Sequence, residues 1–194
     1  PTRATEFESQ HVGVFRSGWG DTNETMLSFK GGEMGQDHGN LDAGTFVLEA
    51  LGKRWAWELD ADDYSLPGYF DLNPASATNR WDYYRTRAEG QNTIVINPGN
   101  GPDTKLGPVA PVVTFQSKTG VRSLAVIDLT PVSTNVVRAW RGLQLFGPQR
   151  KQVLIQDEIT SGSNANVWWF MHYQINSTQV EVSPDGSSVT MTQG

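Results

Sequence analysis

The sequence predicts an all-β protein, an antiparallel β-sandwich of about ten to twelve strands. Three observations support this prediction. Apolar residues recur at helical spacing almost nowhere in the 194 residues. Short runs rich in Val, Ile, Phe and Trp recur instead, which is typical of strands. Gly, Pro, Asn and Asp separate these runs at the spacing found in sandwiches.

The first half of the chain predicts five strands. These are residues 12–18, 25–32, 45–51, 54–60 and 92–98. Gly52-Lys53 is the expected two-residue connection of the hairpin between the third and fourth strands. The stretch 61–90 is polar, aromatic and least like a strand, so we expect a long loop over one sheet. Long loops of this kind often carry function.

The second half predicts strands that pair with their neighbours in the chain. The expected strands are 109–117 with 121–129, 135–146 with 151–159, then 167–175, and a hairpin over 180–192. The first pair turns at 118–120, and the last hairpin turns at Pro184-Asp185-Gly186, a combination that favours a tight turn. No repeat or linker divides the chain, so residues 1–194 are expected to form one domain.

Composition excludes several classes of protein. The chain has no cysteine, and its net charge is −6 with a pI near 5.0, which disfavours nucleic acid as a partner. Its longest apolar run, 167–171, is far below the ~20 residues that a membrane span needs. The N-terminus has neither the features of a signal peptide nor an initiator Met. We therefore expect a fragment of a longer protein, with no membrane contact.

His38 is the histidine whose surroundings favour chemistry. It lies in a polar, Gly-containing loop between Asp37 and Asp42, where a neutral imidazole can act as acid, base or metal ligand. An ordinary loop residue is the competing interpretation. His172 lies in an expected apolar strand and is interpreted as structural, and His11 is given no role.

Known motifs for other chemistries are absent. The sequence contains no HExxH, no G-x-S-x-G, no Walker loop and no GxGxxG. The acidic run 60–63 lacks the glycine and the distal glutamate of a calcium loop. We therefore expect no cofactor.

Two long stretches resemble the heparinase II/III-like polysaccharide lyases. They are DHGNLDAGTFVLEALGKRWAWELDADDYSLPGYF and RWDYYRTRAEGQNTIVINP, preceded by VFRSGW and LSFKGG and followed by VLIQDEI and WWFMH. The resemblance covers about residues 12–175. It implies the first part of a supersandwich that follows an N-terminal α/α toroid, which this chain lacks. It also implies cleavage of an acidic, uronate-containing polysaccharide by β-elimination, in which a base removes the C5 proton and an acid protonates the departing O4.

The resemblance also implies roles for individual residues. His38 matches the histidine that the family's sandwich contributes to catalysis. By position, Tyr64 and Tyr84 are the other catalytic candidates. Tyr69, Arg80 and Arg85 are the substrate-binding candidates, because cations and aromatic rings suit an anionic sugar.

The family's zinc positions differ in this chain. They match Asn40, Glu58 and Gln91, so that two amides stand where the family has imidazoles. Amides are poor zinc ligands, and one carboxylate does not hold the ion. We therefore predict no zinc, with a hydrogen-bonded polar cluster in its place. The family's Asn before the catalytic histidine is Asp37 here.

Three functions remain open from the sequence. The first is the sandwich domain of a polysaccharide lyase, inactive without its toroid and located in the periplasm or outside the cell. The second is a carbohydrate-binding or structural module without chemistry. The third is a pseudoenzyme that has lost both metal and catalysis.

Overall fold

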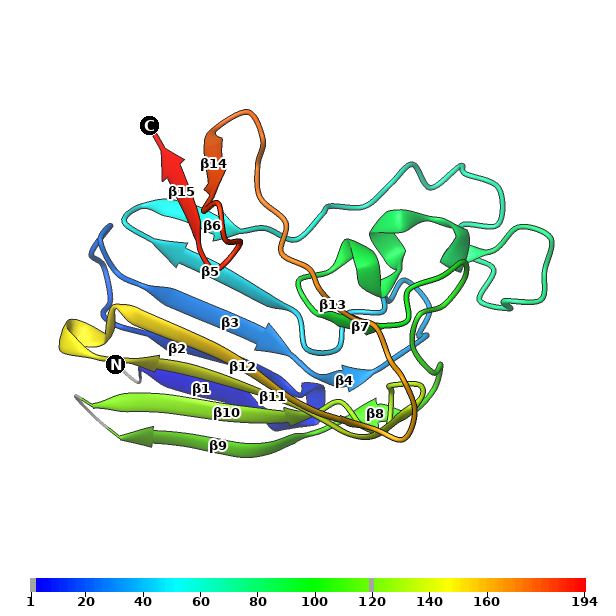
Figure 1. Cartoon of the computed structure of the whole chain (residues 1–194), viewed down its shortest axis with the longest axis horizontal. Helices are drawn as coiled ribbons and strands as arrows, with labels where there is room; N and C mark the ends of the chain where they lie inside the picture. The colour runs from blue at the N-terminus through cyan, green and yellow to red at the C-terminus, as the bar shows by residue number, and fades with distance from the viewer. Residues whose placement is uncertain (1–2, 119–120) are drawn as a thin grey trace.

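The chain folds as an all-β, antiparallel sandwich, as predicted. The computed structural model describes residues 3–118 and 121–194. Within these it contains fifteen strands and five one-turn 3₁₀ helices, and no α-helix. Figure 1 shows two main layers, with the loop-rich part of the chain projecting to one side. None of the helices in the described residues is long and apolar enough to cross a membrane.

The first layer is a five-stranded sheet in the order β1-β2-β3-β5-β6. Its strands are β1 (Ala4–Phe7), β2 (Val12–Arg16), β3 (Met26–Lys30), β5 (Phe46–Ala50) and β6 (Lys53–Ala56). The helix η1 (Glu8–Gln10) joins β1 to β2. Buried and half-buried residues alternate along β2 and β3, so that one face of the sheet points into the core.

The second layer is a four-stranded sheet in the order β12-β11-β10-β9. Its strands are β9 (Val112–Lys118), β10 (Arg122–Asp128), β11 (Val136–Phe146) and β12 (Gln152–Ser161). The predicted pairing of 109–117 with 121–129 and of 135–146 with 151–159 is confirmed. Thr119 and Gly120 of the first turn lie outside the described residues. The helix η5 (Pro148–Arg150) makes the second turn.

The hydrophobic core lies between the two layers. The Phe15 ring of β2 packs on Phe115 of β9, with ring centroids 5.4 Å apart. Ile127, Leu143 and Leu145 of the second sheet are fully buried in the same cluster. Burial of a side chain of this size contributes about 1.5–3 kcal/mol. Packing of apolar faces therefore joins the layers that Figure 1 shows one over the other.

Three small sheets complete the fold. They pair β4 (Gly32–Glu33) with β8 (Val109–Ala110), β7 (Ile94–Ile96) with β13 (Val167–Trp169), and β14 (Thr178–Val182) with β15 (Val189–Gln193). The last pair is the predicted C-terminal hairpin. The other expected strands are found with shorter bounds, and the sequence did not indicate β1 or β4.

Two sequence predictions are wrong in detail. The β5–β6 turn consists of Leu51 and Gly52, both with positive φ, rather than Gly52-Lys53. Glycine thus takes the second central position of a primed turn. The strand expected over 167–175 ends at Trp169. Phe170 still donates to Thr93 O just before β7, but His172 bonds to the Asn92 side chain and to Trp57 N instead.

The stretch 61–90 is a loop with three 3₁₀ helices, as its polar composition suggested. The helices are η2 (Arg80–Asp82), η3 (Tyr84–Thr86) and η4 (Ala88–Gly90). Asn79 caps η2 and receives the backbone N–H of Trp81 at 3.0 Å. The fully buried Trp81 donates its indole N–H to Leu72 O at 3.0 Å. One buried aromatic side chain therefore anchors an otherwise polar loop.

A buried arginine joins the second sheet to the loops at the edge of the first. Arg141 of β11 is fully buried and donates to both carboxylate oxygens of Asp157 on β12, at 2.7 and 2.8 Å. Its third nitrogen, Nη1, donates to the carbonyls of Gly44 at 2.8 Å and Asn92 at 3.0 Å. All three guanidinium nitrogens therefore have acceptors.

We predict that Arg141→Met lowers the free energy of unfolding by about 3–5 kcal/mol, because it leaves the Asp157 carboxylate without its partner. Arg138→Met is the matched control. Arg138 lies on the same strand, but its pair with Glu158 is solvent-exposed at 3.1 Å, so its loss costs about 1 kcal/mol or less. Urea unfolding of both variants measures the difference. An equal loss of unfolding free energy in the two variants would contradict the prediction.

Candidate functional site

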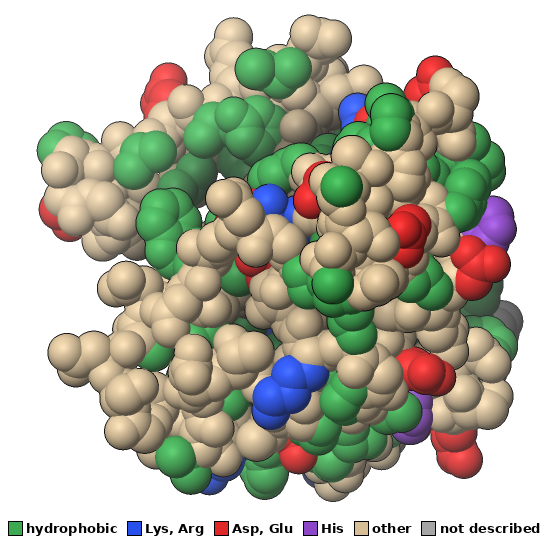
Figure 2. Space-filling view, turned by 90° about the vertical axis from the view of Figure 1, so that its right-hand side faces the viewer, with side chains coloured by type: hydrophobic (Ala, Val, Ile, Leu, Met, Phe, Trp, Pro, Cys, Tyr) green, Lys and Arg blue, Asp and Glu red, His purple; other side chains and the backbone are tan. Residues whose placement is uncertain are grey.

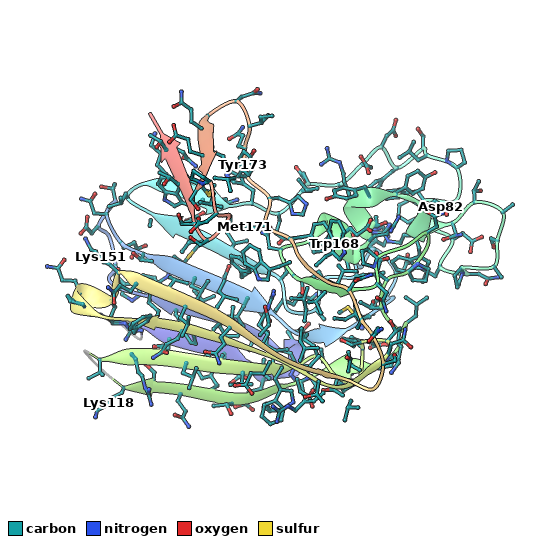
Figure 3. The ribbon with its side chains drawn as sticks, viewed as in Figure 1. Asp82, Lys118, Lys151, Trp168, Met171 and Tyr173 are labelled. Atoms are coloured by element: carbon teal, nitrogen blue, oxygen red, sulfur yellow. The ribbon has the colours of Figure 1, made fainter. Side chains whose placement is uncertain are left out.

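A hollow of about 790 Å³ opens where the loop after β4, the end of β6, the loop 61–90 and residues 170–175, here called the 170s segment, meet. We call it the His38 hollow. Its lining residues are His38, Asn40, Arg54, Trp57, Glu58, Leu59, Asp60, Ala61, Tyr64, Tyr69, Arg80, Arg85, Tyr173, Gln174 and Ile175. Figure 3 shows Met171 and Tyr173 on the segment that passes between the β5–β6 hairpin and the loop of η2–η4. Four stretches of chain therefore form one concave surface.

His38 presents its imidazole to solvent at this hollow. Its side chain is 60% exposed, and its backbone has φ 59°, in the left-handed region. The backbone N–H bonds to Asp37 Oδ1 at 3.0 Å, which fixes the tip of the loop. The ring packs against Phe70, with centroids 4.9 Å apart, and against Tyr64 at 6.0 Å. The imidazole is thus held by rings and remains free to exchange a proton.

Arg80 holds the loop that carries His38. It is 2% exposed, and it donates to Gly39 O at 2.7 Å, Tyr69 O at 3.0 Å and Asn40 Oδ1 at 3.1 Å. Its guanidinium also lies over the Tyr69 ring, 4.7 Å from the centroid. Because all three guanidinium nitrogens of Arg80 donate to protein groups, Arg80 supports the loop that lines the hollow.

The remaining predicted side chains differ in how open they are. Tyr64 is 56% exposed and stacks on the buried Tyr69, with ring centroids 5.5 Å apart. Arg85 is half-exposed and forms an ion pair with Asp62 at 2.9 Å, and it donates to Asp60 O at 3.1 Å. Tyr64 and Arg85 are therefore the predicted groups that a ligand in the hollow can reach directly.

Five of the six predicted site residues line this one hollow, and Tyr84 is the exception. Its hydroxyl lies 3.0 Å from Nε2 of His172. The sequence interpretation assigned His172 to a strand with a structural role. The structure places it beyond the end of β13, half-buried and hydrogen-bonded to a predicted site residue. In the sequence His172 follows an aromatic run, and this pattern does not indicate a contact with Tyr84.

The three positions that resemble the family's zinc ligands each have protein partners. Asn40 accepts from Arg80, as described above. Glu58 accepts from the Thr45 hydroxyl and, at 3.4 Å, from Asn92. Gln91 is buried and donates to Arg85 O at 2.6 Å. No described hydrogen bond joins the three to one another, so they do not form the single polar cluster expected from the sequence.

The described part of the chain contains no group of three or more His, Cys, Asp or Glu side chains placed to hold a metal ion. The absence of zinc stays a prediction.

Burial makes Glu58 an unusual acid. The pKa of this carboxyl is raised from 4.5 to about 7, mainly by desolvation on burial and also by the nearby Asp42. The Thr45 hydroxyl and the Lys30 ammonium act in the opposite direction. Lys30 itself is committed to Asp42, with Nζ 2.7 Å from both carboxylate oxygens. The hollow therefore contains a carboxyl group that is partly protonated at neutral pH.

The side chain of Asn92 connects the segments behind the hollow. Its Nδ2 donates to Phe46 O and Trp57 O, each at 2.8 Å, and its Oδ1 accepts the backbone N–H of His172 at 2.6 Å. Its backbone N–H donates to the Thr45 hydroxyl at 3.1 Å. One fully buried amide thus ties β5, the end of β6 and the 170s segment together.

The surface at the loop end of the molecule is mixed in charge. In Figure 2, acidic side chains are scattered among hydrophobic ones, and the described residues form no continuous basic patch on this face. Around the hollow, Arg54 and Arg85 each pair with a carboxylate, Glu49 and Asp62 respectively. An anionic ligand would therefore have to compete with acidic side chains for these cations.

Comparison with known proteins agrees with the fold. No protein-family model matches the chain, and no curated protein matches it in sequence. Among solved structures, it is similar to the heparan sulfate lyase HepC from Pedobacter heparinus, with a TM-score of 0.66 and 15% identity over 91% of this chain. It is also similar to the heparinase III BT4657 gene product, with a TM-score of 0.68 and 18% identity over 94% of this chain.

The chain spans about a quarter, 25%, of each of these lyase chains. Its fold is therefore that of one part of a heparinase-type lyase. The resemblance that the sequence motifs indicated is confirmed at the level of the fold.

We predict that Glu58→Gln stabilises the protein at pH 8 but not at pH 4. A raised carboxyl pKa stabilises the fold fully below about 4.5, and this contribution is lost as the pH rises through about 7. Ionised Glu58 therefore costs about 3 kcal/mol at pH 8, which the neutral amide avoids. Urea unfolding across this range measures the effect. Glu181→Gln, at an exposed position of β14, controls for loss of a charge, and an equal gain there would contradict the prediction.

Proposed function

We propose that this chain is the β-sandwich part of a polysaccharide lyase that cleaves a uronate-containing polysaccharide by β-elimination. The observation that carries the proposal is the His38 hollow itself. A fold shared with heparinase-type lyases over more than nine-tenths of the chain holds a solvent-open imidazole beside Tyr64, and Arg85 lines the same hollow. These are the residue types that proton abstraction next to a carboxylate requires.

The roles follow from how each group is held. His38 exchanges a proton with the substrate, and Tyr64 is the adjacent acid or base candidate within the same aromatic cluster. Arg85 binds the uronate carboxylate, which lowers the charge that develops when the C5 proton leaves. Arg80 and Tyr69 act from beneath, because both are almost fully buried and support the loop of His38.

His38 and Tyr64 are each more than half exposed at the hollow, which fits a site that another domain completes. We therefore propose that the chain is inactive alone and acts with an N-terminal α/α toroid in a longer, periplasmic or secreted bacterial protein. No cofactor is included in the proposal.

A carbohydrate-binding module without chemistry is the second candidate. Trp168 and Trp169 of β13 are about half exposed, as is Tyr64 at the hollow. Aromatic faces of this kind stack on sugar rings. The ion pairs that engage Arg54 and Arg85 compete with neutralisation of a uronate carboxylate, which β-elimination needs and stacking on a sugar ring does not.

We predict that His38→Ala in the full-length protein lowers the rate of β-elimination by roughly 10²–10⁴-fold, the usual contribution of a general acid or base. The ultraviolet absorbance of the unsaturated uronate product reports the rate. His11→Ala is the matched control, since His11 also has a left-handed backbone, with φ 52°, but does not line the hollow. An unchanged rate in His38→Ala would contradict the assignment, and binding without product would support the second candidate.

A further inference from the structure

Tyr84 and His172 form a hydrogen-bonded pair beside the His38 hollow. They are 88 residues apart in the chain, yet the Tyr84 hydroxyl lies 3.0 Å from Nε2 of His172, and the rings meet edge to face with centroids 5.9 Å apart. Tyr84 is 47% exposed, so part of its side chain is open to solvent. Neither the sequence motifs nor the function proposed above gives His172 a role.

The buried Asn92 determines which nitrogen of His172 carries the proton. Because Nδ2 of Asn92 donates to Phe46 O and Trp57 O, its Oδ1 must be the atom that faces His172. That oxygen accepts the backbone N–H of His172 and lies 3.2 Å from Nδ1 of the ring. An oxygen can only accept there, so Nδ1 bears the proton in the neutral ring and Nε2 offers its lone pair to Tyr84.

The surroundings keep the pair uncharged at rest. Burial lowers the pKa of His172, and the Glu89 backbone carbonyl acts in the opposite direction. Burial also raises the pKa of Tyr84, with Glu89 raising it further and Arg87 lowering it. At neutral pH the phenol is therefore the donor and the imidazole the acceptor.

The pair adjoins the hollow through its chain neighbours. Arg85 and Tyr173, which follow Tyr84 and His172 in the chain, both line the hollow. Trp57 lines it too, and its backbone N–H donates to His172 O at 2.9 Å. A long polymer in the hollow would therefore pass close to the half-exposed Tyr84 side chain.

We propose that Asn92, His172 and Tyr84 form a proton relay that serves the lyase reaction, with Tyr84 as the catalytic residue and the other two as positioning residues. The proposal rests on the proposed function. As the C5 proton moves to the Tyr84 oxygen, the phenolic proton passes to Nε2 of His172. The C5–H electron pair forms the C4–C5 double bond, and the C4–O4 pair leaves with O4. His38, which exchanges a proton with the substrate in the proposed function, gives a proton to O4 and regains one from solvent, while His172 loses the relayed proton to solvent through Tyr84, so that the protons balance.

The relay itself can be tested in this chain without substrate. Nitrogen-15 NMR of His172 is expected to show a protonated Nδ1 and an unprotonated, hydrogen-bonded Nε2. Tyr84→Phe should shift the Nε2 resonance and leave Nδ1 in place. Tyr83→Phe is the matched control, because the Tyr83 hydroxyl bonds to Pro67 O instead, and it should shift neither. A proton on Nε2, or no response to Tyr84→Phe, would overturn the relay.

Its use in catalysis is tested in the full-length protein. Tyr84→Phe and His172→Gln should each lower kcat by roughly 10²–10⁴-fold with little change in KM. The double variant should be no slower than the slower single one, since the two act as a unit. His172→Gln should also remove the acid limb of the kcat profile. Full activity in either single variant would overturn the catalytic role.

The NMR experiment and the kinetic experiment distinguish failure of the relay from failure of the proposed function. A wild-type protein that makes no unsaturated product would overturn both the proposed function and the catalytic use of the relay, while NMR would still decide whether the relay exists. An active wild type whose Tyr84 and His172 variants are also fully active would overturn the inference alone.

Discussion

The arrangement of the site depends on one buried side-chain amide. Asn92 satisfies backbone groups of Phe46, Trp57 and His172 at once, and all of these bonds are 2.8 Å or shorter. Buried backbone groups that lose their partners cost about 1–3 kcal/mol each. The backbone carbonyl of Asn92 also accepts a hydrogen bond from Arg141, and Arg141 in turn donates to Asp157. The bonds of one residue therefore run from the second sheet to the segments around the hollow.

The hydrogen bonds of Asn92, which we call the Asn92 hub, explain how a site built from loops keeps a defined shape. Beyond Phe170 the chain leaves β7, and the backbone groups of His172 bond to the Asn92 side chain and to Trp57 N. On the other side, Arg80 ties the loop of His38 to Tyr69. Two buried polar side chains thus fix the two walls of the hollow, while Tyr64, His38 and Arg85 remain exposed between them. Rigid support with open reactive groups is what a catalytic site requires.

The sequence predicted the layers of the fold better than the contacts of the site. Hydrophobic runs of β type and turn residues gave most strands and the pairings of β9 with β10 and β11 with β12, because these depend on local patterns. The strand expected over 167–175 was too long, because His172 takes the side chain of Asn92 as its partner, and Asn92 lies far away in the chain. The family resemblance indicated six candidate site residues, and five of them line the His38 hollow. It missed the contact of Tyr84 with His172, which only the three-dimensional arrangement creates.

Amide hydrogen exchange at His172 in an Asn92→Ala variant tests the central role of the hub most directly. We predict much faster exchange at this amide, because it loses its only described acceptor. We also predict that the free energy of unfolding falls by about 3 kcal/mol or more. Asn73→Ala, which removes an exposed side-chain bond to Ala75, should leave His172 unchanged. Exchange and stability like those of the wild type in Asn92→Ala would contradict the account.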